Sequence, residues 1–285
     1  MRRRINISSY ILLGESAWLS ESVMSYYPFV NEIIAVYDKN FMSFTGHNIK
    51  TRYEDCFATL NELDVDRKVK YVCEDFVAKT DDLMVADTYM RQYALNSTSS
   101  RADLVIQIDG DEIVPDPFHF LSCIDKFVDS DYFAMEYSAR WLYTHIASGF
   151  FLERCNRDFT YWHAIPGPVV IRPGLELVHS RQTDKPCMRF EPGGRHADMN
   201  VKQSLLHPSM LRTDKSIREK MEYLSGHSKQ IPGMQIYEDW KFAKKNPFLF
   251  CIISKLLRKS EIYRPVSLSY ASHLLLDGLQ KYYYN

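Results

Sequence analysis

Short apolar runs alternate with helical patterns over the first 112 residues of the chain. The strand-like runs lie at 5–13, 32–38, 68–73 and 103–108, and apolar side chains recur with helical spacing at 16–27 and 84–95. Strands separated by helices predict an α/β fold, with a mostly parallel central sheet and helices on both of its faces. Ligands of such sheets bind at the carboxyl ends of the strands. Asp38 and Asp109 both follow an apolar run, so one crevice could hold both side chains.

The pattern becomes less regular after residue 130. Strand-like runs are expected at 132–137 and 169–172, and a helix is expected over 214–225. The stretch 185–200 contains two prolines and two glycines, which predicts a mobile loop.

Composition excludes several classes of protein. The 285 residues are 46% hydrophobic and 25% charged, which indicates a packed protein rather than a disordered one. The formal net charge is −1, and binding to a phosphate backbone needs a strong basic excess, so no nucleic-acid partner is expected.

The six cysteines show no CxxC pair and no common zinc spacing, which favours buried, reduced thiols. The apolar stretch near the N-terminus, residues 10–13, is too short for a signal sequence or a membrane span. These features together predict a cytoplasmic protein.

The chemistry is concentrated in Asp109-Gly110-Asp111-Glu112, which directly follows an apolar strand. Two carboxylates separated by one residue offer the oxygen ligands that Mg²⁺ or Mn²⁺ takes together with phosphate oxygens and water. Acidic side chains clustered at a dry strand end also repel one another unless a cation neutralises them. The motif therefore predicts a divalent metal site formed by Asp109 and Asp111.

Several segments in order resemble a family 2 glycosyltransferase of the GT-A fold. They are the opening strand and helix from Tyr10 to Ser22, the strand 32–38, the helix end Met90-Arg91-Gln92-Tyr93-Ala94-Leu95, and the motif at 109–112. The resemblance covers about residues 5–125 and weakens toward 228. It implies a GT-A domain over 1–228, with a nucleotide-binding half (about 1–125) and an acceptor half (about 126–228), followed by a helical extension over 229–285.

The resemblance also implies roles for individual residues on the donor side. Asp38 would contact the nucleoside of a nucleotide-sugar donor, and Arg91 would approach the donor near its phosphates. Asp109 and Asp111 would bind the ribose and the metal, with Asp111 as the more direct metal ligand. Glu15 belongs to the donor site, although the usual Asn-Glu of the family is Gly14-Glu15 here.

A later segment resembles the stretch after the sheet in related transferases. There His207 would complete the metal coordination, and Arg212 would face the diphosphate. The activity implied is transfer of a sugar from a nucleoside diphosphate to a hydroxyl of a glycan or lipid-linked acceptor, with Mn²⁺ or Mg²⁺ as cofactor and inversion at the sugar carbon. The resemblance further implies a role in surface polysaccharide or glycoconjugate synthesis.

Inverting transfer needs a carboxylate that takes the proton of the acceptor hydroxyl. Asp198 is the first candidate because it lies in a glycine-containing stretch just before His207; Glu191 is the second and Glu153 the third. An aromatic group in the middle of the chain could form an acceptor platform or belong to the core: Trp141, Tyr143, Tyr161, Trp162 and His163.

The segment from Trp240 to Arg264 carries seven Lys or Arg against one acid, Glu261, around the apolar run 248–253. Six apolar residues cannot cross a bilayer, which needs about twenty. Two interpretations stay open. A basic amphipathic helix could contact the inner face of a membrane peripherally, or a helix could dock on the sheet with its lysines in water.

Two other functions also fit the sequence. Residues 105–112 match the motif of a haloacid-dehalogenase-type phosphatase, with Asp109 as nucleophile and Asp111 as acid, but that motif normally opens its domain. The chain could also be a catalytically degenerate, glycosyltransferase-like binding protein. A sugar-1-phosphate nucleotidyltransferase would need a basic, glycine-rich loop after the first strand, but residues 14–18 are neither basic nor rich in glycine.

Overall fold

The structure is a computed structural model that describes residues 5–43, 46–80, 82–147, 149–156, 158, 166–196, 199–225, 233–257 and 261–268. The chain forms two compact units. The first comprises Met1–Ser138 and Ile165–Gln203, and the second comprises Ala139–Ala164 and Ser204–Asn285. The expected boundary at residue 228 lies within the second unit, and the division into a transferase domain and an extension stays a prediction.

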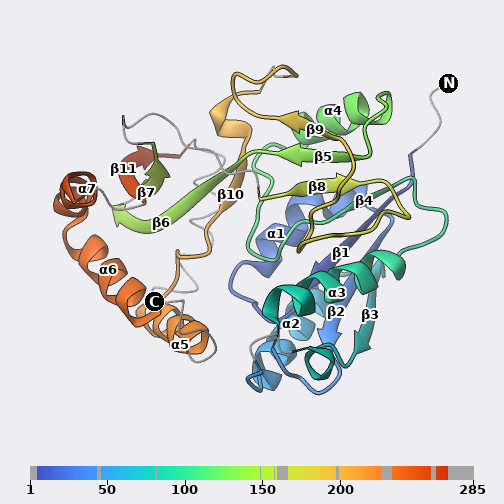
Figure 1. Cartoon of the computed structure of the whole chain (residues 1–285), viewed down its shortest axis with the longest axis horizontal. Coiled ribbons are helices and arrows are strands. Elements are labelled where there is room, and N and C mark those ends of the chain that lie inside the picture. Colours follow the sequence, from blue (N-terminus) through green and yellow to red (C-terminus); the bar gives the residue numbers. More distant parts are fainter. Residues whose placement is uncertain are drawn as a thin grey trace. The chain divides into compact units, whose positions relative to one another are not determined.

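The first unit is built on a seven-stranded sheet with the order β3-β2-β1-β4-β8-β5-β9 (Figure 1). Its strands are β1 (Ile7–Leu12), β2 (Glu32–Asp38), β3 (Val69–Glu74), β4 (Leu104–Ile106), β5 (Ala134–Tyr137), β8 (Pro168–Ile171) and β9 (Cys187–Phe190). β1 to β4 run parallel, β8 runs antiparallel to both of its neighbours, and β5 and β9 are parallel. The predicted α/β class, with a large, mostly parallel sheet flanked by helices, is confirmed.

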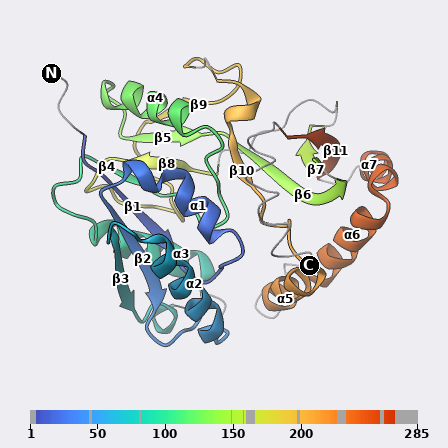
Figure 2. The same cartoon turned by 180° about the vertical axis from the view of Figure 1, so that it is seen from behind.

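Helices cover both faces of this sheet (Figures 1 and 2). They are α1 (Leu19–Tyr26), α2 (Lys50–Leu63), α3 (Leu83–Asn96) and α4 (Pro117–Val128), with short 3₁₀ turns at Tyr27–Phe29, Val77–Lys79 and Val201–Gln203. Successive side chains of a strand point to opposite faces. Tyr10 of β1 accordingly shares a core cluster with Met90 and Ala94 of α3, whereas Ile11 lies with Leu19 of α1 beside Gly110.

The stretch 185–200 was expected to be a mobile loop, and for residues 187–190 this expectation is wrong. Cys187–Phe190 forms β9, which pairs in parallel with β5 from Ala134 opposite Cys187 to Tyr137 opposite Phe190. Proline and glycine on either side indicate a loop locally, but the hydrogen bonds of β5 make these four residues a strand.

The second unit contains a four-stranded sheet with the order β10-β6-β7-β11. Its strands are β6 (Ala139–Ala147), β7 (Phe150–Cys155), β10 (Leu205–His207) and β11 (Ile262–Ser267), and its helices are α5 (Asp214–Ser225), α6 (Gly233–Lys245) and α7 (Pro247–Leu256). Tyr143, Trp240, Phe250 and Tyr263 form the centre of its core. Among the described helices of the chain, none is long and apolar enough to cross a bilayer.

All six cysteines are free, as predicted, and four of them are buried while Cys73 and Cys187 are partly buried. Burial raises the pKa of the Cys56 thiol to about 12 and that of Cys251 to about 11. These thiols stay protonated at neutral pH and behave as small apolar side chains.

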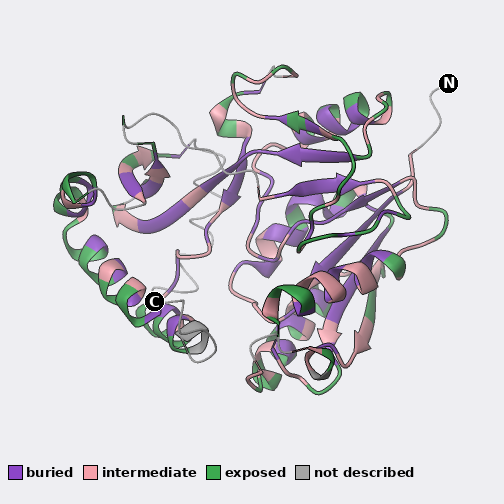
Figure 3. Ribbon diagram, in the orientation of Figure 1, coloured by how far each residue is buried: buried purple, intermediate pink, exposed green. Residues whose placement is uncertain are grey.

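Helix α4 carries both buried and exposed residues (Figure 3), and two of its phenylalanines differ sharply in burial. Phe120 is 0% exposed, and its ring meets that of Tyr137 edge-on at 5.1 Å, whereas Phe118 is 86% exposed. We expect Phe120→Ala to lower the free energy of unfolding by about 3–5 kcal/mol because it leaves a cavity. Phe118→Ala should change it by no more than about 0.5 kcal/mol. Urea denaturation of the two variants measures this difference, and equal effects would contradict the packing described.

Candidate functional site

The motif Asp109-Gly110-Asp111-Glu112 forms a tight turn at the carboxyl end of β4. The amide of Glu112 donates to the carbonyl of Asp109 at 2.9 Å, which closes the turn. The hydroxyl of Ser22 on α1 donates to the same carbonyl at 2.9 Å. Since β4 lies between β1 and β8, the turn follows a fully buried strand in the middle of the sheet, as the sequence predicted.

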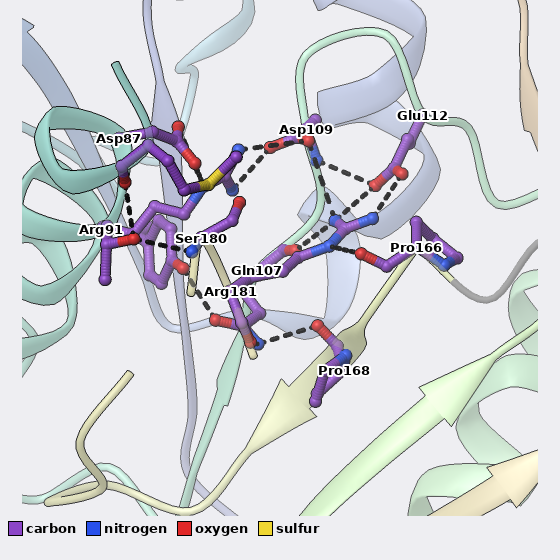
Figure 4. A network of polar contacts seen from close by, with 12 residues as sticks. Asp87, Arg91, Gln107, Asp109, Glu112, Pro166, Pro168, Ser180 and Arg181 are labelled. Atoms are coloured by element: carbon purple, nitrogen blue, oxygen red, sulfur yellow. Dashed lines mark hydrogen bonds and ion pairs between the residues drawn. The ribbon is translucent and has the colours of Figure 1, made fainter. Parts of the chain in front are cut away.

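Arg91 of α3 binds the Asp109 carboxylate in a bidentate pair (Figure 4). Its Nη1 donates to Asp109 Oδ1 at 2.8 Å and its Nη2 to Oδ2 at 3.3 Å. Its Nε donates to both oxygens of Asp87, one helical turn earlier, at 3.1 and 3.0 Å. The guanidinium group therefore links two carboxylates, and its predicted approach to donor phosphates stays a prediction.

A second arginine, which the sequence did not reveal, lies on the other side of the turn (Figure 4). Arg181 donates from Nη1 and Nη2 to the two oxygens of Glu112, at 2.7 and 2.5 Å. It also donates to the backbone carbonyls of Gln107 at 2.9 Å and of Pro166 at 3.1 Å. Only 3% of the Arg181 side chain and 2% of the Glu112 side chain are exposed. The preceding residue, Ser180, has a φ of 53°, in the left-handed region that non-glycine residues seldom adopt.

Gln107 extends this network into the sheet. Its Oε1 accepts from the Tyr10 hydroxyl at 2.7 Å, and its Nε2 donates to the carbonyls of Pro168 and Arg181 at 2.7 and 3.0 Å. Burial raises the pKa of Tyr10, so this hydroxyl remains a donor at every relevant pH. The segment that carries Arg181 is thereby attached to β4 through the amide of Gln107 as well as through Glu112.

Asp109 is ionised because of its two arginines. Burial by itself would raise the pKa of its carboxyl, but the charges of Arg91 and Arg181 outweigh burial and hold the pKa below its usual value. Arg181 Nη1 lies 3.8 Å from Asp109 Oδ2. The negative charge of Asp111 acts in the opposite direction on the same pKa, which indicates that the two carboxylates of the motif influence one another. The Asp109 side chain still keeps 31% of its surface exposed.

Of the other predicted donor residues, Glu15 lies beside the turn. Gly14 has a φ of 133° where the chain leaves β1, and the carbonyl of Glu15 lies 3.6 Å from the position that a Cβ on Gly110 would take. The structure thus brings Arg91 and the backbone of Glu15 to the turn that carries Asp109 and Asp111.

Asp38 ends β2 at the same edge of the sheet but is 1% exposed. Its Oδ1 accepts from the amides of Asn40 at 2.9 Å and Met42 at 3.1 Å, and its Oδ2 accepts from those of Phe76 at 2.9 Å and Val77 at 3.5 Å. This carboxylate holds the loops after β2 and β3 together. Its predicted contact with a nucleoside stays a prediction, and it requires some of these hydrogen bonds to open.

His207 and Arg212 belong to the second unit. His207 ends β10, and its ring lies 5.1 Å from that of Trp141. Arg212 is buried and donates from Nε to the carbonyl of Ser209 at 2.6 Å. Their predicted roles at the metal and the diphosphate stay predictions.

The candidates for the base have different outcomes. Asp198, the first, lies outside the described residues. Glu191 directly follows β9, and its carbonyl accepts from the amide of Gly194 at 3.0 Å; its role stays a prediction. Glu153 is wrong as a candidate because it is 0% exposed and ion-paired with Arg140 at 2.5 Å in the core of the second unit.

The aromatic residues expected to form an acceptor platform or to belong to the core also have different outcomes. Tyr143 is a core residue that stacks on Phe250 with ring centroids 5.7 Å apart. Trp141 is partly buried, and its ring lies 5.1 Å from the His207 ring and 5.5 Å from the guanidinium carbon of Arg154. The other three members, Tyr161, Trp162 and His163, lie outside the described residues.

Neither a protein-family model nor a curated protein sequence matches the chain. Among solved structures, it is similar to 4-diphosphocytidyl-2C-methyl-D-erythritolsynthase from Anaerococcus prevotii DSM 20548, with 14% identity, a TM-score of 0.31, and coverage of 84% of this chain and 83% of that one. Mannose-6-phosphate isomerase from Helicobacter pylori has 13% identity, a TM-score of 0.32, and coverage of 52% and 55%.

Glucosyl-3-phosphoglycerate synthase from Mycobacterium tuberculosis, in complex with Mn²⁺, uridine diphosphate and phosphoglyceric acid, has 18% identity and a TM-score of 0.29. That match covers 49% of this chain and 43% of the synthase, so the chain spans about half or less of the last two proteins.

Proposed function

We propose that the chain is a metal-dependent glycosyltransferase that moves a sugar from a nucleoside-diphosphate donor to a hydroxyl of a glycan or lipid-linked acceptor. The observation that carries this proposal is the turn after β4, in which Asp109 is fixed by two arginines and Asp111 follows two residues later. The resemblance to family 2 glycosyltransferases supports the same assignment. We further propose that the transfer inverts the sugar carbon and serves surface polysaccharide or glycoconjugate synthesis in the cytoplasm.

The two acids of the motif are suited to different tasks. Both oxygens of Asp109 already accept hydrogen bonds from Arg91, so this carboxylate is better suited to orient a ribose hydroxyl at its exposed edge than to bind a cation directly. Asp111 is half-buried in the same turn and is the proposed metal ligand. The ion pairs at Asp109 and Glu112 hold the turn in place before any ligand binds, which favours a preorganised site.

The protein groups fit Mg²⁺ or Mn²⁺ that is held partly by the donor. Among the described residues, no group of three or more His, Cys, Asp or Glu side chains gathers into a complete cation site. Mg²⁺ commonly uses one or two carboxylates and completes its shell with substrate phosphates and water. When bound, such an ion acts as a Lewis acid on the leaving diphosphate.

The remaining steps belong to side chains of the protein. Asp198, or Glu191 as the second candidate, would accept the proton of the acceptor hydroxyl as that oxygen attacks the sugar carbon. Arg212 would compensate charge on the leaving diphosphate, and His207 would add a neutral ligand to the ion. The donor nucleoside would lie toward Glu15 and Asp38.

A panel of nucleoside diphosphates tests this function. We expect UDP, GDP, CDP, ADP or dTDP to raise the melting temperature in the presence of Mn²⁺, with one base preferred. At a ligand concentration of about 100 times Kd, the stabilisation is about 2.7 kcal/mol, which corresponds to a shift of at least about 5 °C. Differential scanning fluorimetry measures this shift.

The control is the same panel in EDTA, together with the monophosphate of the preferred base, and neither should reproduce the shift. The proposal fails if no diphosphate stabilises the protein, or if the shift is the same in EDTA as in Mn²⁺.

A further inference from the structure

Helix α7 exposes an apolar stripe on its outer side. Phe248, Ile252 and Leu256 follow one another at intervals of four residues, and Leu249 and Leu257 flank them; all five are between 48% and 73% exposed. Figure 3 shows that α7 carries exposed residues, in green, as well as buried ones, in purple. Isolated exposed apolar residues are ordinary, but five on one ten-residue helix and its C-terminal end form a patch of the kind that marks an interaction site.

The helix cannot bury this stripe by rotating, because its other side is already packed. Phe250, Cys251 and Ser254 are buried. The Phe250 ring stacks on that of Tyr143 at an interplanar angle of 4° and lies 5.3 Å from that of Tyr263 on β11. The core of the second unit therefore fixes which side of α7 faces outward.

Positive charge surrounds the stripe. Lys244 and Lys245 end α6 immediately before α7, and Lys255 lies in its last turn; all three are exposed. No acidic residue occurs in the sequence 241–257. The next acid, Glu261, is paired with Arg154 at 2.9 Å. An apolar stripe with lysines at both ends matches the boundary between anionic lipid headgroups and acyl chains.

We propose that α7 binds the surface of an anionic membrane, with the stripe inserted at the headgroup boundary and Lys245 and Lys255 against the headgroups. A second copy of the chain is a poorer occupant. A two-fold interface places the same patch on both sides, so the lysines at the ends of one helix would face those of the other. The helix binds in the plane of the surface, because its ten residues extend only about 15 Å.

Vesicle flotation tests this proposal with the full-length protein. We expect the wild type to float with vesicles of phosphatidylcholine and phosphatidylglycerol, and much less with phosphatidylcholine alone. Phe248→Ser combined with Ile252→Ser should reduce bound protein about tenfold. Lys245→Gln combined with Lys255→Gln should reduce binding to anionic vesicles by about tenfold or more, because each lysine near such a surface strengthens binding by about fivefold.

The matched control is Phe118→Ser, which removes a side chain that is 86% exposed on a helix of the first unit and should leave flotation unchanged. Binding that is absent, equal on neutral vesicles, or equally lost in Phe118→Ser would overturn the proposal. So would a concentration-dependent dimer in gel filtration that Phe248→Ser with Ile252→Ser abolishes, because the stripe would then serve a second copy.

Discussion

Glu112→Gln is expected to lower the free energy of unfolding by about 3–5 kcal/mol, the usual cost of removing one partner of a buried ion pair. The variant keeps the shape of the side chain but leaves the Arg181 guanidinium, of which 3% is exposed, without its bidentate carboxylate. Water cannot replace the lost carboxylate, because the guanidinium group is buried and is also held by hydrogen bonds to the carbonyls of Gln107 and Pro166. Urea denaturation at neutral pH measures the loss.

The pair of Glu136 and Arg189 provides the comparison. Arg189 Nε lies 2.7 Å from Glu136 Oε2, a similar distance, but through a single contact, and 52% of the Arg189 side chain is exposed. Glu136→Gln should therefore cost less than about 1 kcal/mol. Replacing both buried partners, Glu112→Leu with Arg181→Met, should recover part of the loss because neither charge of the pair is left without its partner, and Asp109 keeps its pair with Arg91. If Glu112→Gln and Glu136→Gln had equal effects, the buried network would not stabilise the turn as described.

Much of the structure of residues 5–125 could be predicted because the sequence signals there are local. Apolar residues recur there with the spacing of the element that forms. The predicted strands at 32–38 and 103–108 and the predicted helix at 84–95 therefore agree within a few residues with the observed elements at 32–38, 104–106 and 83–96. The parallel direction of β1 to β4 also follows from the alternation of strand and helix. β9 and β11 could not be predicted, because their pairing with β5 and β7 comes from segments far away in the chain.

The two arginines beside the acidic motif could not be predicted from the motif itself. The sequence indicated that acids clustered at a dry strand end need a cation, and that physical premise holds. Part of the compensation comes from Arg91 and from Arg181, which lies 69 residues from its partner Glu112. The segment around Ser180 and Arg181 has no periodicity and no motif, so no local signal could have placed Arg181 beside the turn.

The same arginines bear on the phosphatase alternative. That chemistry uses Asp109 as the nucleophile. Here its two oxygens are held by Arg91, and its pKa is lowered by Arg91 and Arg181 against the effect of burial. A carboxylate that is stabilised in this way is a weaker nucleophile, so the geometry favours an orienting role for Asp109.

Asp111→Asn is expected to weaken the Mn²⁺-dependent affinity for a nucleoside diphosphate by on the order of 100-fold or more, because it removes the proposed ligand of the ion. The ion pairs described in the turn hold Asp109 and Glu112. Asp109→Asn should also destabilise the protein, since it leaves Arg91 and Arg181 without a shared counter-charge. Asp184→Asn, at a side chain that is 61% exposed, is the matched control and should behave as the wild type.

The decisive measurement is calorimetric titration of the preferred nucleoside diphosphate into wild-type and Asp111→Asn protein, with Mn²⁺ and with EDTA. We expect binding only to the wild type in Mn²⁺, and loss of that binding in the Asp111→Asn variant. Equal affinity of the two proteins in Mn²⁺, or equal affinity of the wild type in Mn²⁺ and in EDTA, would contradict it.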